Sequence, residues 1–191
     1  MARWQPDARG RLAAAAFELF RERGFEQTTV ADIAARAGLD KRTFYRLFGD
    51  KREALFSGSG ELEEILVKAV AETDAAPFEA VVAGFRQVAV EIFADRRELV
   101  RMRQSIIESS PELQERELRK TGSLVAAVTA ALRARGLGES TATLATESGV
   151  TVFRVAYARW VAADGDASLA DLIAEVAAEL RAITSAPGAT P

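Results

Sequence analysis

Apolar residues recur at spacings of three and four along nearly the whole chain, which is the period of an α-helix with one buried face. No run alternates apolar and polar residues as a half-buried strand would, and the good helix formers Ala, Leu, Glu and Arg dominate. Glycine and proline residues divide the chain into about nine helical segments. The breaks fall at Gly24, Gly38, Gly49, 57–60, Pro77, Pro111, 136–138 and Gly165. The sequence therefore predicts an all-α fold.

Two short helices are predicted after a longer first one. Thr29 precedes the first short helix, and Asp32 follows at the spacing of a capping box. Gly38 ends this helix, and Asp40 caps the next one. Two short helices joined by a three-residue turn that begins with glycine form a helix-turn-helix, whose second helix can lie in the major groove of DNA. The three expected helices span about 7–23, 30–37 and 41–48.

The second short helix has two chemically different faces. Phe44, Leu47 and Phe48 form an apolar stripe that should face inward. The other face carries cationic and hydroxyl side chains, which are the groups that contact phosphates and base edges. A merely solvated surface is the alternative for its two arginines. The residues of this outward face are Lys41, Arg42, Thr43, Tyr45 and Arg46.

These features occur in one order over about residues 9–56. The matching positions are Phe25-Glu26-Gln27-Thr28-Thr29-Val30-Ala31-Asp32-Ile33-Ala34, Ala37-Gly38, Thr43-Phe44-Tyr45-Arg46-Leu47-Phe48-Gly49-Asp50-Lys51 and Ala54-Leu55-Phe56. This block resembles the DNA-binding domain of the tetracycline-repressor (TetR) family. The resemblance implies a homodimer that binds a palindromic operator in double-stranded DNA, most often as a repressor, and that responds to a small-molecule effector.

The resemblance also indicates which side chains touch DNA. Arg42 or Lys41 has the donors to pair with guanine, a contact that specifies one base position. Thr43 and the ring of Tyr45 can meet a thymine methyl group. By analogy with family members, the backbone phosphates are contacted by Thr28, Thr29, Tyr45 and Lys51.

Two long helices near the C-terminus, over about 141–163 and 168–184, carry apolar seams. In the last helix the apolar residues are spaced by four and three in turn, which is typical of a seam that packs on a partner helix. Two such helices from each of two copies would form a four-helix bundle around a two-fold axis. Burial of the seams within one copy is the alternative. The predicted dimer contacts are Gly149, Phe153, Ala156, Trp160, Leu169, Ile173, Val176 and Leu180.

Bulky residues in the middle of the C-terminal region are candidates for the wall of an effector pocket. A plain apolar core explains them equally well, and arginines in such places often pair with glutamate. Residues 111–118 also resemble a segment of members related to the mycofactocin regulator, some of which respond to acyl thioesters. The pocket candidates are Phe85, Met102, Arg103, Ile106, Phe153 and Tyr157.

The sequence contains no cysteine and no histidine. Their absence excludes Cys/His zinc sites, cysteine nucleophiles, Ser-His-Asp triads and disulfides. Neither a P-loop nor a strand-borne dinucleotide motif is present. We therefore expect no metal, no cofactor and no enzymatic activity.

Charge is distributed unevenly along the chain. Residues 1–56 hold eleven Lys and Arg against eight Asp and Glu, whereas the remainder is acidic. A basic head suits a protein that touches a polyanion with one end. No uncharged apolar stretch is long enough to cross a membrane, so we expect a cytoplasmic protein without a membrane partner. The expected domains are a helix-turn-helix domain over 1–50, a ligand-binding and dimerisation domain over 51–185, and a disordered tail over 186–191.

Gly58 and Gly60 fall where a helix should link the two domains. Each glycine costs about 0.5–1 kcal/mol relative to alanine within a helix, so this helix either starts late or is soft. Softness would allow an effector to change the separation of the two reader helices in a dimer. The main alternative function is a small-molecule-binding or protein-interaction module that does not bind operator DNA.

Overall fold

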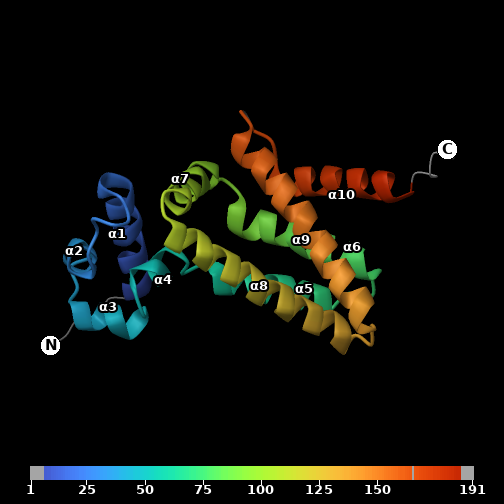
Figure 1. Cartoon of the computed structure of the whole chain (residues 1–191), viewed down its shortest axis with the longest axis horizontal. Helices are drawn as coiled ribbons and strands as arrows, with labels where there is room; N and C mark the ends of the chain where they lie inside the picture. The colour runs from blue at the N-terminus through green and yellow to red at the C-terminus, as the bar shows by residue number, and fades with distance from the viewer. Residues whose placement is uncertain (1–6, 165, 186–191) are drawn as a thin grey trace. The chain divides into compact units, whose positions relative to one another are not determined.

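The computed structural model describes residues 7–164 and 166–185, and every regular element within them is helical (Figure 1). The predicted all-α fold is therefore confirmed. The bounds in these residues are α1 (Ala8–Arg23), α2 (Val30–Arg36), α3 (Lys41–Leu47), α4 (Lys51–Leu55), α5 (Ser59–Ala71), α6 (Pro77–Val88), the π-helical segment η1 (Ala89–Phe93), α7 (Arg97–Glu108), α8 (Pro111–Ala134), α9 (Glu139–Ala162) and α10 (Leu169–Ser185).

The first helix ends lie where the sequence predicts them. The Thr29 hydroxyl accepts the Asp32 N–H, and the Asp32 carboxylate accepts the Thr29 N–H, so the predicted capping box is present at α2. Gly24 and Gly38 have φ values of 83° and 65°, in the left-handed region that glycine adopts without strain. The chain then leaves helical geometry at 56–58, so the linking helix α5 starts late.

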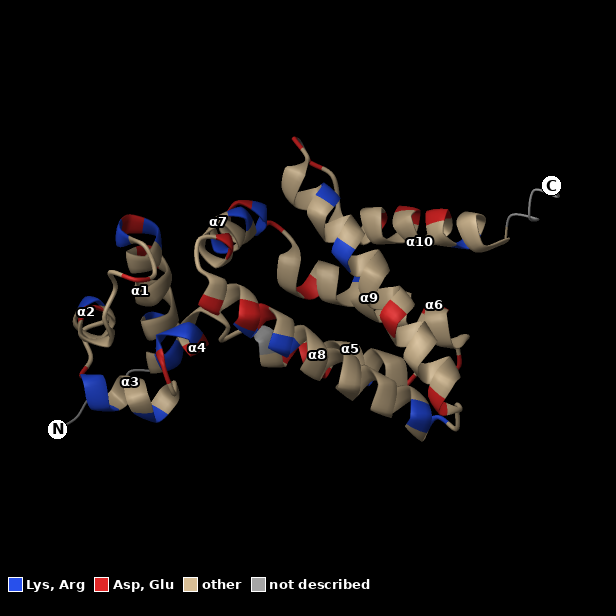
Figure 2. Ribbon diagram, in the orientation of Figure 1, with Lys and Arg blue, Asp and Glu red and all other residues tan. Residues whose placement is uncertain are grey.

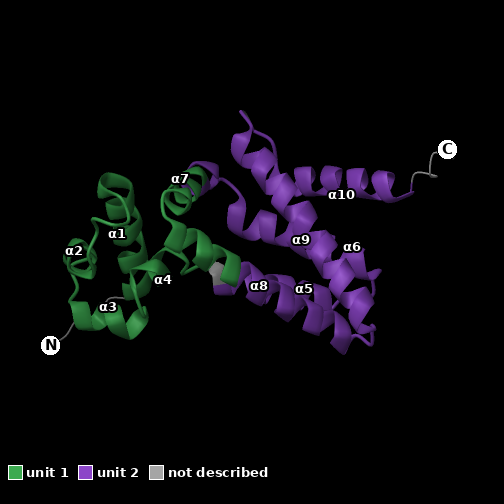
Figure 3. Cartoon of the chain, in the orientation of Figure 1, with its two compact units in different colours: residues 1–59, 101–119 green, residues 60–100, 120–191 purple. Residues whose placement is uncertain are grey.

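The chain divides into two compact units (Figure 3). Unit 1 consists of residues 1–59 and 101–119, and unit 2 of 60–100 and 120–191. This division differs from the expected boundary after residue 50, because α4 and parts of α7 and α8 pack with the N-terminal helices. The tail expected over 186–191 lies outside the described residues.

One hydrophobic core holds unit 1 together. Leu12 of α1, Ile33 of α2 and Phe44 of α3 are completely buried in it. Ile107 and Leu113, which come from the second stretch of the unit, are buried in the same cluster. The apolar contacts of these last two residues explain why 101–119 belongs with the helix-turn-helix.

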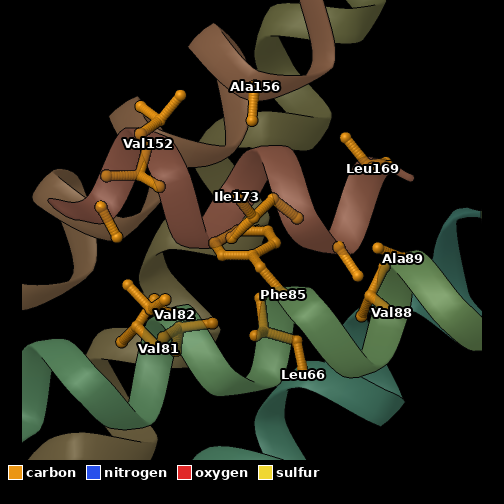
Figure 4. Close-up of a cluster of buried hydrophobic side chains, with 14 of the residues drawn as sticks. Leu66, Val81, Val82, Phe85, Val88, Ala89, Val152, Ala156, Leu169 and Ile173 are labelled. Atoms are coloured by element: carbon orange, nitrogen blue, oxygen red, sulfur yellow. The ribbon is translucent and has the colours of Figure 1, made fainter. Parts of the chain in front are cut away.

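Helices α6, α9 and α10 supply most of the core of unit 2 (Figure 4). Phe85 of α6 is buried at its centre, and Figure 4 shows its ring beside Ile173 of α10. The same ring stacks on Phe153 of α9 with a centroid distance of 4.6 Å. Full burial of a side chain of this kind contributes roughly 1.5–3 kcal/mol, so these three helices depend on one another for stability.

The predicted dimer seams lie inside this core. Trp160 is buried and donates its indole N–H to the Ala167 carbonyl of the same chain at 3.1 Å. Helix α6 packs against both seam helices and covers the surface that a second copy was expected to cover. Most of these side chains are therefore covered within one copy, while the pairing of two copies through these helices stays a prediction. Those buried are Gly149, Ala156, Trp160, Leu169, Ile173 and Val176, and those partly buried against the core are Phe153 and Leu180.

Gly149 allows α9 to approach α6 closely. A Cβ atom at this position would lie 2.3 Å from Cγ1 of Val81, which is closer than two carbon atoms that are not bonded to each other can come. At Gly122, on the exposed side of α8, an added Cβ would meet nothing within 4 Å. The two glycines therefore offer a matched pair for testing this packing.

Gly149→Ala is expected to destabilise unit 2 by about 1–3 kcal/mol, because an overpacked core must shift. Gly122→Ala is expected to stabilise the chain by about 0.5–1 kcal/mol, since alanine is the better helix former. Thermal unfolding of the full chain measures both effects, and Val81→Ala should recover part of the loss caused by Gly149→Ala. Equal stability of Gly149→Ala and the wild type would contradict the described contact between α6 and α9.

Candidate nucleic-acid interface

The N-terminus of α3 is held by Asp40. Its carboxylate accepts the N–H of Thr43 at 2.7 Å, which is the N-cap predicted from the sequence. This backbone hydrogen bond is the main cause that lowers the pKa of Asp40, and a hydrogen bond with the Thr43 side chain adds to it. Asp40 therefore remains ionised at neutral pH and stabilises the first turn of α3.

The inner face of α3 is anchored in the core of unit 1. Phe44 is completely buried and Phe48 nearly so, with ring centroids 5.4 Å apart, while Leu47 is half-buried. The three side chains confirm the apolar stripe predicted for this helix. Because these side chains face inward, the helix must present its other face to solvent.

The outer face of α3 is basic and exposed. Figure 2 shows Lys and Arg at both ends of this helix. Within the described residues, Lys41, Arg42 and Arg46 are exposed and have no hydrogen-bond or ion-pair partner, so their charges are available to an anion. Tyr45 is 57% exposed, and Thr43 is half-buried beside the cap. The structure thus brings together the five reader residues predicted on this helix.

Two arginines of α1, which the sequence analysis did not single out, fix the C-terminal ends of α2 and α3. Arg9 donates to the Leu47 carbonyl at 2.9 Å, and its guanidinium lies 4.6 Å from the centroid of the Phe48 ring. Arg11 donates to the Ala37 carbonyl. A cation at a helix C-terminus satisfies free carbonyl groups and interacts favourably with the helix dipole. In the sequence both residues look like ordinary surface positions of an amphipathic helix, so no local signal reveals this role.

Thr28 does not belong to the exposed surface. Its side chain is buried, and its hydroxyl donates to the Gly24 carbonyl at 2.8 Å and to the Leu19 carbonyl at 3.3 Å. The expectation that this side chain contacts phosphate is therefore at odds with the structure. Thr29 beside it is exposed, although its hydroxyl already binds Asp32 at 2.6 Å.

Lys51, the other residue expected to contact phosphate outside α3, is half-buried at the start of α4. Its ammonium group faces backbone carbonyls of the turn between α1 and α2. The sequence pattern identifies a lysine at this position, but the pattern contains nothing about which acceptors it faces.

The six predicted pocket residues do not come together in one unit. Arg103 pairs with Glu117 at 2.9 Å and lies over the ring of Phe56, all within unit 1. Ile106 is buried in the core of that unit. The sulfur of Met102 accepts a hydrogen bond from the guanidinium of Arg21 in the same unit. In unit 2, the other three join a cluster of neighbouring aromatic rings. Its members are Phe85, Phe93, Phe153, Tyr157 and Trp160.

Two of the hollows on the surface of the described residues lie in different units. One of about 150 Å³ in unit 2 is bordered by Glu79, Arg86 and Arg181, and one of about 380 Å³ in unit 1 by Arg11 and Arg36 among others. Neither hollow is lined by a predicted pocket residue. The described residues also contain no cluster of acidic side chains suited to a metal ion, and no helix long and apolar enough to cross a bilayer.

Two family models match the chain. Residues 12–57 match the model of bacterial regulatory proteins of the tetR family, and residues 75–185 match the model of the MftR C-terminal domain. The second match alone covers more than half of the 191 residues. The chain therefore belongs to the TetR family of bacterial regulatory proteins, with a C-terminal domain of the MftR type.

Individual regulators are also similar to this chain in sequence or structure. The HTH-type transcriptional regulator TcmR of Streptomyces glaucescens is 34% identical over 82 residues, which is 42% of this chain and 36% of TcmR. FadR of Thermus thermophilus, a TetR family transcriptional repressor solved in complex with lauroyl-CoA, is 25% identical with a TM-score of 0.58, over 96% of this chain and 98% of FadR. A proposed transcriptional regulator of Pseudomonas aeruginosa PAO1 is 16% identical with a TM-score of 0.68, over 97% of this chain and 94% of its own. This last likeness shows the fold alone.

The cap at α3 predicts a measurable titration. Because the pKa of Asp40 is lowered in the folded chain, its stabilising contribution is complete above the ordinary Asp pKa of about 3.9 and is lost as the pH falls through the lowered value. The amide chemical shift of Thr43, followed by NMR in the full chain, should therefore titrate with a midpoint below about 3.9. Asp40→Asn keeps an oxygen acceptor and should abolish this titration. A midpoint at the ordinary value would contradict the hydrogen bond.

Proposed function

We propose that this protein is a ligand-responsive transcriptional regulator, a repressor that binds operator DNA through α3 and releases it when a small-molecule effector binds. The observation that carries the proposal is the two-sided character of α3. Its phenylalanines anchor it in the core, while three cationic side chains and Tyr45 are exposed on the other face. The family and the FadR repressor among its structural neighbours support the same function. DNA binding of this kind places the protein in the cytoplasm.

Some side chains of α3 would contact base edges, and others would contact backbone phosphates. A guanidinium can donate two parallel hydrogen bonds to O6 and N7 of guanine, and Arg42 is the candidate for this contact. Lys41 stands in the first turn, where the helix N-terminus also favours an anion. Thr29, Tyr45 and Arg46 would contact phosphates or a thymine methyl group. Phosphate contacts position the helix, and base contacts specify the operator.

We further propose that two copies act together on a palindromic operator, as the family implies. Because most of the seam residues named above are covered within one copy, we place the second copy against the outward faces of α9 and α10. These faces carry exposed apolar side chains, Leu144 of α9 at 68% exposed and Ile183 of α10 at 75%. Symmetric pairing of such faces is the commonest way in which soluble chains dimerise.

Helix α8 is the candidate element for coupling effector binding to the reader helix. It is one continuous helix, although its first nine residues belong to unit 1 and the rest to unit 2. Within unit 1, Arg116 pairs with Glu53 at 2.5 Å, and Glu112 pairs with Arg52 at 2.6 Å, so that α8 is tied to α4. A shift of α8 would therefore displace α4, because the two ion pairs join these helices. Helix α4 directly follows the helix-turn-helix.

The effector class is suggested by FadR, which binds lauroyl-CoA. An acyl thioester combines an apolar chain with a polar head, and the aromatic cluster of unit 2 offers apolar surface for such a chain. Three of its rings, those of Phe93, Phe153 and Tyr157, are partly exposed. Acyl-CoA molecules are therefore the first effectors to test.

Arg42→Ala is expected to relax the preference at one base position of the selected DNA, with a loss of about 1–3 kcal/mol of discrimination. Selection of bound DNA from a random pool by the full chain measures this preference together with palindromy and half-site spacing. Arg23→Ala, which removes an exposed arginine at the end of α1, is the matched control and should leave the selected sequence unchanged. An unaltered preference in Arg42→Ala would show that α3 reads DNA through other residues, and failure of the wild type to select any sequence would reject operator binding.

Gly58 lies in the break between α4 and α5, and Gly60 lies in the first turn of α5. Replacement of both by alanine should favour helix at this break, because alanine is the better helix former and neither added Cβ meets an atom within 4 Å. The double variant is expected to lose response to effector more than affinity for operator. Release of labelled operator during titration with lauroyl-CoA, and with a metabolite extract, measures the response, with Gly122→Ala as the control. A double variant that responds like the wild type would contradict a role for this break.

A further inference from the structure

The ammonium group of Lys51 is surrounded by three backbone carbonyls. Nζ donates to the Phe25 carbonyl at 2.8 Å, to the Thr28 carbonyl at 3.2 Å and to the Glu26 carbonyl at 3.4 Å. It also lies 4.1 Å from the centroid of the Phe25 ring, whose side chain is buried. The charge thus faces the turn between α1 and α2.

A lysine ammonium has three N–H donors and no acceptor. Because three carbonyls already face these donors, a phosphate contact by Lys51 would have to replace at least one of them. An exposed cation of α3 such as Lys41 loses no internal hydrogen bond when it binds phosphate. The arrangement around Lys51 is therefore suited to holding the turn and poorly suited to neutralising DNA.

The contact with Thr28 closes a segment of chain that contains the entire helix-turn-helix. Thr28 and Lys51 are 23 residues apart, and α2 and α3 both lie between them. From α1, outside this segment, Arg11 donates to the end of α2 and Arg9 donates to the end of α3. Lys51 joins the two ends of the segment, so it acts together with Arg9 and Arg11 to fix the orientation of α3.

We propose that Lys51 is a positioning residue that closes the helix-turn-helix segment and holds the reader helix in its productive orientation, without contacting phosphate. This inference rests on the proposed DNA binding. Loss of the hydrogen bonds from Lys51 leaves the number of phosphate contacts unchanged but lets α3 vary in orientation. Specific binding therefore falls while non-specific binding is retained.

The test compares the wild type with Lys51→Met, which keeps an unbranched side chain over Phe25 and removes the charge. Affinity for the selected operator and for random DNA is measured with the full chain over a range of salt concentrations. The ratio of the two affinities should fall by about tenfold, because charge-assisted hydrogen bonds are lost. The dependence of log K on log salt concentration should keep its wild-type slope. Lys41→Ala should reduce the slope by about 0.9 for each bound copy in which Lys41 contacts one phosphate, or about 1.8 for a dimer.

Amide hydrogen exchange supplies a readout that does not need DNA. Protection of the α2 and α3 amides should fall in Lys51→Met, and Lys51→Arg, which can still donate to carbonyls, should restore both protection and the affinity ratio. A slope reduced by about 0.9 for each bound copy in Lys51→Met would overturn the proposal in favour of a phosphate contact. An unchanged affinity ratio, or unchanged protection, would overturn it as well. If the wild type binds no DNA, the proposed function fails. Amide hydrogen exchange in Lys51→Met and the wild type then still decides whether Lys51 holds α2 and α3 in place.

Discussion

An α-helix of seven residues is unstable by itself in water, because nucleation is costly and few of its backbone groups are paired within the helix. Both helices of the helix-turn-helix have this length. They persist because their ends and inner faces are satisfied by neighbours: Asp40 at the start of α3, Arg9 at its end and the core around Phe44. The cationic residues of the outer face, Lys41, Arg42 and Arg46, take no part in these contacts and remain exposed.

Helical spacing alone does not determine which chain covers the apolar seams of the C-terminal helices. Apolar residues at spacings of four and three show that a helix must be covered on one side, but the covering helix can come from the same chain or from another copy. In this protein α6 covers Ile173 and its neighbours, and Gly149 lets it approach closely. The family implies two copies, and a contact between them through α9 and α10 stays a prediction.

The division into units bears on regulation. Segment 101–119 packs with the helix-turn-helix through Leu113 and the ion pair between Arg116 and Glu53, although it lies far from that motif in sequence. Helix α8 continues from this segment into unit 2. Because this helix is continuous from one unit into the other, it is a covalent path through which the two units can influence each other. Its unit 2 part lies within the match to the MftR C-terminal domain.

The sequence by itself determined the all-α class, the capped helix-turn-helix and the residues on each face of α3, because caps, turn glycines and helical spacing act over a few residues. Only the tertiary structure decided that Thr28 is buried, that Lys51 faces three carbonyls and that Arg103 pairs with Glu117. It also separated the expected pocket residues into two units. These outcomes depend on which distant groups meet, and hydrogen-bond partners and packing neighbours that are far apart in the chain leave no periodic signal in it.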